Sequence, residues 1–171
     1  MERYTDALLS TEGGTDTIGL TIWDFGGQTV FYTLHHLFLT EYGIYMIVFN
    51  AEKVLDENEQ ESTIDFLKFW LFSKKIHAPT AMALIVATHI SKVRRDLGEI
   101  DRILSERVLQ LAQFNHIPST DYCFHPIENM TGEGIPTLRR DFEEILQSAD
   151  FVKDNVPLKF TRLLDLYLAA G

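Results

Sequence analysis

Three apolar runs, separated by stretches with helical periodicity, constrain the fold of this chain most. The runs are Gly43–Asn50, Ala81–Thr88 and Tyr122–Ile127. Short, continuously apolar segments are typical of strands that are covered on both faces in a parallel sheet. The stretches with apolar side chains at helical spacing are Ser62–Lys75, Leu97–Phe114 and Gly134–Leu146. Strands and helices in alternation predict an α/β fold with a mainly parallel sheet between two helical layers.

The beginning of the chain follows a different pattern. Residues Thr17–Asp24 alternate apolar and polar side chains, which predicts a strand with one apolar face. Such a strand delivers Asp24 to the carboxyl edge of the sheet. Residues Met1–Asp16 mix Thr, Glu, Asp and Gly and include the pair Gly13-Gly14, so we predict a loop or disordered segment there.

Composition excludes several classes of protein. With 46% hydrophobic residues among 171, the chain can bury the core of one domain. A formal net charge of -10 without a basic cluster argues against nucleic acid as the main partner. The longest apolar run is too short for a transmembrane segment. A single cysteine, Cys123, and the lack of a signal peptide favour a reducing compartment, so we expect a cytoplasmic protein.

The segment after the first predicted strand has the residues of a magnesium–nucleotide site. Asp24 ends that strand, and Phe25-Gly26-Gly27-Gln28 follows. A carboxylate here suits Mg²⁺, a glycine amide suits a terminal phosphate, and an amide side chain suits the orientation of water. A plain glycine turn explains the same residues without a ligand. A protein-kinase Asp-Phe-Gly is excluded, because no His-Arg-Asp loop or Val-Ala-Ile-Lys strand accompanies it.

Two further segments lie where base-recognition loops of nucleotide-binding sheets occur. Thr88-His89-Ile90-Ser91 follows the second apolar run, and Glu128–Gly134 follows the third. Guanine recognition normally uses a carboxylate that accepts from the ring N–H and the exocyclic amine, whereas Ser91 offers only a hydroxyl. Asn129 or nearby backbone amides could contact a base edge. The alternatives are a surface histidine at a strand end and a glycine turn at a helix start.

Taken together, several of these segments resemble the Roc domain, the Ras-like GTPase module of Roco proteins. They are Asp24–Gln28, Val30–Leu39, Thr88-His89 and Thr131–Ile135. The tail Val156–Leu164 is similar to the start of the COR segment that follows Roc in that family. The resemblance implies a partial Roc-like domain over 17–148, and a linker with the start of a COR-like helix over 149–171.

The family resemblance also implies roles for single residues in binding and hydrolysing GTP. Asp24 is expected to hold Mg²⁺ through water, Gly27 to present its amide to the terminal phosphate, and Gln28 to orient the attacking water. Thr88 and His89 are expected to line the guanine base of GTP or GDP, and Asn129 is expected to support it.

The chain departs from the family pattern upstream of Asp24. No Gly-x-x-x-x-Gly-Lys-[Ser/Thr] sequence occurs in the 171 residues. We therefore predict an incomplete Ras-like three-layer sandwich of the P-loop NTPase type, missing the first strand, the phosphate loop and the first helix. Nucleotide binding by such a chain is expected to be weak or absent. The alternative is a non-catalytic domain that binds a protein partner or a second copy through the switch-like run at 30–39 and the C-terminal helix.

Overall fold

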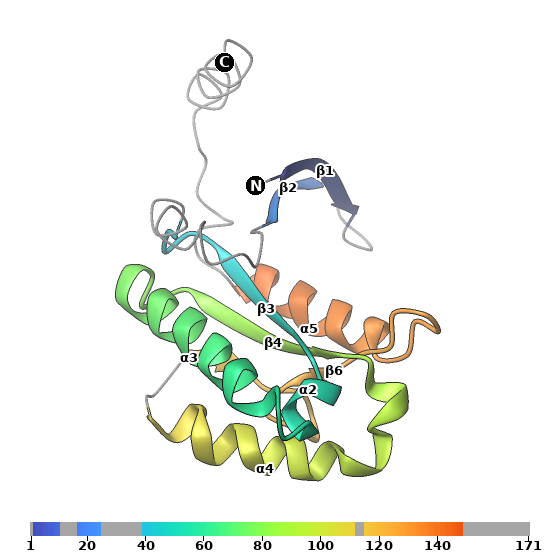
Figure 1. Ribbon diagram of the computed structural model, residues 1–171. Coiled ribbons are helices and arrows are strands. Elements are labelled where there is room, and N and C mark those ends of the chain that lie inside the picture. The colour runs from blue at the N-terminus through green and yellow to red at the C-terminus, as the bar shows by residue number, and fades with distance from the viewer. Residues whose placement is uncertain (1, 11–16, 25–38, 112–114, 149–171) are drawn as a thin grey trace.

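A parallel sheet of four strands lies at the centre of the computed structural model, which describes residues 2–10, 17–24, 39–111 and 115–148 (Figure 1). Its strands are β3 (Ile44–Asn50), β4 (Met82–Thr88), β5 (His116–Ile117) and β6 (His125–Pro126). β3 and β4 pair along their full lengths. Parallel neighbours need a crossover connection, and α3 (Gln60–His77) supplies it. The predicted α/β fold with a parallel sheet is confirmed.

β5 and β6 occupy the same edge of β4, one after the other. β5 pairs with the first half of β4 and β6 with the second half. Between them, residues 118–124 leave the ladder, and their backbone groups bond elsewhere: the Cys123 amide donates to Asp101 Oδ1 at 2.6 Å. The strand predicted over Tyr122–Ile127 is therefore reduced to two residues.

Helices cover both faces of this sheet. α3 and α4 (Leu97–Arg107) lie on one face, and α5 (Ile135–Ser148) lies on the other (Figure 1). A single turn, α2 (Glu52–Leu55), follows β3. The shorter 3₁₀ helices are Ile90–Lys92, Arg94–Asp96 and Leu109–Leu111. Most of the helical periodicity in the sequence thus marks real helices, although the predicted helix Leu97–Phe114 stops being α-helical after Arg107.

β4 is the most buried strand of the parallel sheet because its side chains alternate between two cores. Ile85 and Ala87 belong to the larger core beneath α3 and α4, together with Phe124. Leu84 and Val86 face α5 and contribute to a smaller core. A strand buried on both faces explains why β4 reads as a continuous apolar run.

β3, in contrast, is covered well on one face only. Ile47 and Phe49 are buried beneath the helices, whereas Met46 and Val48 on the opposite face are 45% and 47% exposed. Among the described residues, β3 pairs with β4 alone, so its other edge has no partner strand there. The apolar sequence of β3 is typical of a strand that is covered on both faces, whereas the described residues cover only one of its faces well.

A separate two-stranded antiparallel sheet precedes the parallel one. β2 (Thr17–Asp24) has the predicted bounds, and it pairs with β1 (Glu2–Ser10) around an irregularity near Asp6. The prediction of a loop over Met1–Asp16 is wrong for Glu2–Ser10. The backbone groups of β1 bond to β2, the next strand in the chain, and such pairing outweighs a weak local strand signal. β2 and β3 belong to different sheets.

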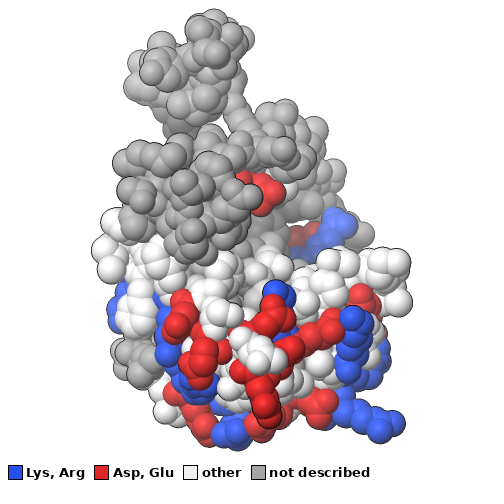
Figure 2. Space-filling view, in the orientation of Figure 1, with Lys and Arg blue, Asp and Glu red and all other residues white. Residues whose placement is uncertain are grey.

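Charged side chains of both signs surround α2, α3 and α4 (Figure 2). Pairs across elements include Lys92 with Glu52 at 3.1 Å and Arg107 with Glu61 at 2.7 Å. Exposed pairs of this kind add little stability. No helix within the described ranges is long and apolar enough to span a membrane.

Candidate functional site

The carboxyl ends of β3, β4 and β6 meet at one edge of the sheet, because parallel strands all point the same way. Asn50 ends β3 directly opposite Thr88, which ends β4. Asn50 Oδ1 accepts from the Glu52 amide at 2.9 Å and so ties the start of α2 to this edge. The Thr88 hydroxyl donates to Phe49 O at 3.0 Å. Buried Thr88 thus fixes the edge rather than presenting its hydroxyl to solvent.

His89 has an unusual backbone conformation at this edge. Its φ of 60° and ψ of 34° lie in the left-handed region, which few residues other than glycine adopt. The conformation turns an exposed imidazole outward between two buried neighbours, Thr88 and Ile90. His89 Nδ1 lies 3.0 Å from Thr88 Oγ1. Because that hydroxyl already donates to a carbonyl, it accepts in this pair and Nδ1 donates.

Glu128 connects the loop after β4 to the loop after β6. The residue is 6% exposed. Oε2 accepts from the Ser91 amide at 3.1 Å, and Oε1 accepts from the Met130 amide at 3.4 Å. Hydrogen bonds from the Ser91 hydroxyl and amide, with a smaller contribution from the Met130 amide, hold the pKa of Glu128 below its usual value. A buried, charged carboxylate therefore lies beside Ser91.

The rest of the second loop is a tight turn. The Glu128 amide donates to Glu133 O at 2.9 Å, and the Gly132 amide donates to Glu128 O at 2.8 Å. Gly132 and Gly134 have φ of 77° and 78°, as the glycine-turn reading expects. Arg94 and Glu133 form an exposed ion pair that joins the same two loops a second time. Asn129 lies exposed within this turn.

The structure brings together three of the six residues singled out from the sequence. The loops that carry Thr88, His89 and Asn129 are joined through Glu128. Asp24 ends β2, in the other sheet, and is exposed. Gly27 and Gln28 lie outside the described residues, as do the switch-like run through residue 38 and the C-terminal helix. Sequence reasoning gave Glu128 no role, although an acid directly after a strand at this edge was a usable signal.

A magnesium-bound nucleotide can be compared with the groups that are present. Asp24 is a single exposed carboxylate, which suits Mg²⁺ because that ion usually takes one or two carboxylates and completes its shell with phosphates and water. The described residues contain no cluster of three or more metal-binding side chains. An outward imidazole and a charged carboxylate in the loops after β4 and β6 are groups that could contact the flat face and the N–H groups of a purine.

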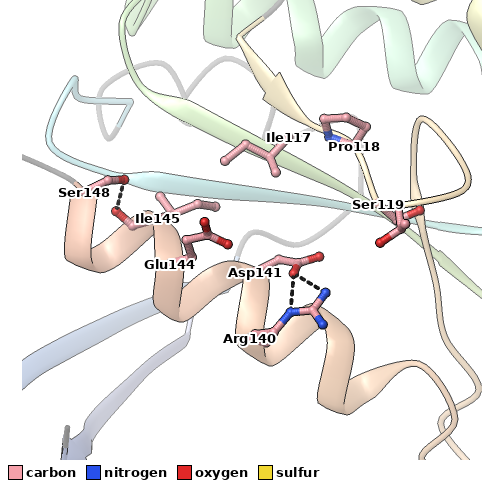
Figure 3. Close-up of a pocket in the computed structure, with 9 residues that line it drawn as sticks. Ile117, Pro118, Ser119, Arg140, Asp141, Glu144, Ile145 and Ser148 are labelled. Atoms are coloured by element: carbon pink, nitrogen blue, oxygen red, sulfur yellow. Dashed lines mark hydrogen bonds and ion pairs between the residues drawn. The ribbon is translucent and has the colours of Figure 1, made fainter.

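A cavity of about 440 Å³ lies elsewhere, between α5 and the loop after β5 (Figure 3). Its polar lining residues are Ser119, Thr120, Arg140, Asp141, Glu144 and Ser148. Arg140 donates to Asp141 Oδ1 at 2.9 Å, so the two charges compensate each other. None of its lining residues belongs to the loops after β4 and β6 at the carboxyl edge.

Cys123 is not a reactive group in this fold. Burial, with a hydrogen bond to Asp101, raises the pKa of its thiol to about 12. A thiol of this kind stays protonated near neutral pH and is a poor nucleophile. Cys123 is half-buried and packs against the larger core.

Comparison with known proteins identifies the family. The family described as "Ras of Complex, Roc, domain of DAPkinase" matches residues 3–91, just over half of the chain. This chain belongs to the Roc family. The matched region includes β1, so the hairpin is part of the Roc match.

Roc relatives are similar over most of this chain but are far longer. The probable serine/threonine-protein kinase pats1 of Dictyostelium discoideum is 30% identical over 150 residues, 87% of this chain and 4% of that protein. Mouse leucine-rich repeat serine/threonine-protein kinase 1 is 28% identical over 97 residues, 57% of this chain and 4% of that protein. This chain therefore spans a small fraction of the curated relatives.

A solved structure supports the same fold. Methanosarcina barkeri Roco2 RocCORdC bound to GDP aligns with a TM-score of 0.56 and 16% identity, covering 88% of this chain and 39% of that one. At that identity the likeness shows the fold: this chain has the Ras-like fold of a Roc domain.

Proposed function

We propose that this chain is a Roc-type module that binds guanine nucleotides, and that the guanine base lies at the carboxyl edge of β3, β4 and β6. The observation that carries the proposal is the pair of preformed loops at that edge, where Glu128 bridges Ser91 and Met130 while His89 projects outward. A loop already held in place loses less conformational entropy on binding. The GDP-bound state of the similar Roco2 structure supports the choice of nucleotide.

Each predicted site residue takes a role in this proposal. Thr88 shapes the loop, His89 lies against the base, and Asn129 supports the base from the second loop. Asp24 holds Mg²⁺ through water, the Gly27 amide faces the terminal phosphate, and Gln28 orients water for hydrolysis. Residues 149–171 supply a linker and the start of a COR-like helix. The single cysteine of the sequence, Cys123, fits a cytoplasmic setting.

We expect the 171 residues alone to bind GTP and GDP weakly. They contain no Gly-x-x-x-x-Gly-Lys-[Ser/Thr] sequence to hold the phosphates. Hydrogen bonds to charged groups contribute about 1.5–3 kcal/mol each. Losing two of them therefore raises the dissociation constant by roughly 10²- to 10⁴-fold. Asp24 and Gln28 cannot replace these contacts, and hydrolysis is expected to be correspondingly slow.

Titration with a fluorescent GDP analogue, with and without Mg²⁺, tests both parts of the proposal. We expect saturable binding with a dissociation constant well above micromolar, and a Mg²⁺-dependent part that disappears in Asp24→Asn. Asp121→Asn, which also removes an exposed carboxylate, is the control and should bind like the wild type. Micromolar or tighter binding contradicts the weak site, and binding that ATP analogues match contradicts the guanine site.

A second candidate function is a protein-interaction or dimerisation domain. The observation that favours it is the apolar face of β3, where Met46 and Val48 are about half exposed beside an unpaired edge within the described residues. Sedimentation equilibrium over a range of concentrations separates the two functions. A dimer that dissociates in Met46→Glu, together with no nucleotide binding, supports the interaction domain.

A further inference from the structure

We propose that Glu128 supplies the base-reading carboxylate that position 91 lacks. The inference rests on the proposed function, because it names the residue that selects guanine at the same site. In the sequence, Ser91 stands where a carboxylate is expected, and a hydroxyl cannot accept two adjacent N–H groups with a full negative charge. The fold returns a carboxylate to that position from the neighbouring loop.

The placement of Glu128 follows from the strand ladder. The Ile127 amide donates to Ala87 O at 2.8 Å, so Glu128 is the next residue past the end of the ladder, level with the loop after Thr88. Its Oε2 lies 3.1 Å from Ser91 N. The acid at 128 and the hydroxyl at 91 are thus direct neighbours, although 37 positions separate them.

The carboxylate retains the capacity to accept from a ligand. An ionised carboxylate has about four acceptor positions, and the Ser91 hydroxyl, the Ser91 amide and the Met130 amide use at most three of them. The Met130 contact, at 3.4 Å, is long and is the one most easily exchanged for a better donor. Guanine presents two adjacent N–H donors, hypoxanthine presents one, and the corresponding edge of adenine presents none.

Other carboxylates near the edge are less suited to this role. Glu133 is exposed, and its charge is paired with Arg94. Asp96 lies at the end of the second 3₁₀ helix, five positions beyond Ser91, and precedes α4. Glu133 therefore offers a matched control: it is an acid on the same loop, and it also joins that loop to the loop after β4.

Base preference tests the inference without depending on phosphate contacts. The ¹⁵N-labelled chain is titrated with GMP, IMP, XMP and AMP to millimolar concentration, and the Ser91 and Met130 amide shifts are followed. We expect the wild type to prefer GMP over IMP by about 10- to 100-fold, the value of one hydrogen bond to a charged group. Glu128→Gln should lose that preference and gain affinity for XMP, because an amide donates to the xanthine carbonyl. Glu133→Gln should behave like the wild type.

A reciprocal exchange separates recognition from simple bridging of the loops. Glu128→Ser should lose guanine preference, and Ser91→Asp combined with Glu128→Ser should regain it. If Glu128→Gln weakens all four nucleotides equally, Glu128 only holds the loops and the inference is overturned. If the wild type prefers GMP and Glu128→Gln keeps that preference, the inference alone fails. If no purine nucleotide shifts the wild-type amide resonances, the proposed function is wrong, and so is this inference, which depends on it.

Discussion

Gly134 is the residue whose replacement the fold tolerates least among the described glycines. Its φ is 78°, and a Cβ built there overlaps the Pro126 carbonyl. Gly132 has nearly the same φ, 77°, but open space around it. The two glycines therefore separate backbone strain from steric overlap.

We expect Gly134→Ala to lower the free energy of unfolding by about 2–4 kcal/mol, from strain plus overlap. Gly132→Ala should cost only about 1–2 kcal/mol, because strain alone applies. Urea denaturation of both variants checks the difference. Equal losses would mean that the Pro126 carbonyl moves aside at little cost.

Glu128 also makes a pH dependence testable at the residue scale. Its pKa is lower in the folded chain than in the unfolded chain, where the usual value is about 4.3. The stabilisation by its hydrogen bonds is therefore fully present above that unfolded value and is lost as the pH falls through the lower folded value. Glu128→Gln should show a smaller loss of stability on acidification below about pH 4.3.

Thermal unfolding at a series of pH values measures this slope. Glu133→Gln is the control, since its exposed ion pair with Arg94 makes a screened contribution. If the Glu128→Gln slope equals the wild-type slope, the hydrogen bonds from Ser91 and Met130 do not favour the charged carboxylate.

At the scale of elements, β3 is the informative one because its two faces differ. Ile47 is 7% exposed and Met46, the next residue on the chain, is 45% exposed. Ile47→Ala should cost about 2–4 kcal/mol of unfolding free energy, from lost transfer energy and a cavity. Met46→Ala should cost less than about 1 kcal/mol. Chemical denaturation of the two variants is the test, and a large loss from Met46→Ala would show that its face is covered.

The elements also show what local sequence can predict. β2 has the predicted bounds, because strict alternation over a strand is a local signal. β1 could not be recognised in the same way. Its strand conformation depends on backbone hydrogen bonds to β2, and its own residues do not show the alternation of a strand. The strand expected at Tyr122–Ile127 was shortened by a side chain far away in sequence, Asp101, which takes the Cys123 amide out of the ladder.

For the whole molecule, the two sheets are expected to differ in their stability against local unfolding. The parallel sheet contains buried cores on both faces, whereas β1 and β2 form a sheet of two strands. Two-stranded sheets are marginally stable by themselves in water. Amide protons of the β3–β4 ladder should exchange at least about 100-fold more slowly than those of the β1–β2 ladder. Hydrogen exchange followed by NMR tests this, and equal protection would mean that the hairpin unfolds together with the core.

The candidate site was predictable in part because its loops follow strands. Thr88, His89 and Asn129 could be selected from their positions after apolar runs, since parallel strands bring such loops to one edge. The left-handed conformation of His89 could not be predicted, because histidine rarely adopts it. Glu128 was missed because its relevance depends on Ser91, which becomes its neighbour only when β4 and β6 pair.

The interruption between β5 and β6 has an evolutionary consequence. Leu84 of β4 pairs with Ile117 of β5, and Val86 pairs with His125 of β6. Two positions along β4 thus correspond to eight positions along the paired segment. The ladder therefore places no limit on the length of the intervening segment, and residues can be gained or lost before Cys123 without moving Glu128. Gaps in alignments of Roc relatives should concentrate at this segment, while the spacing from His125 to Gly134 stays constant.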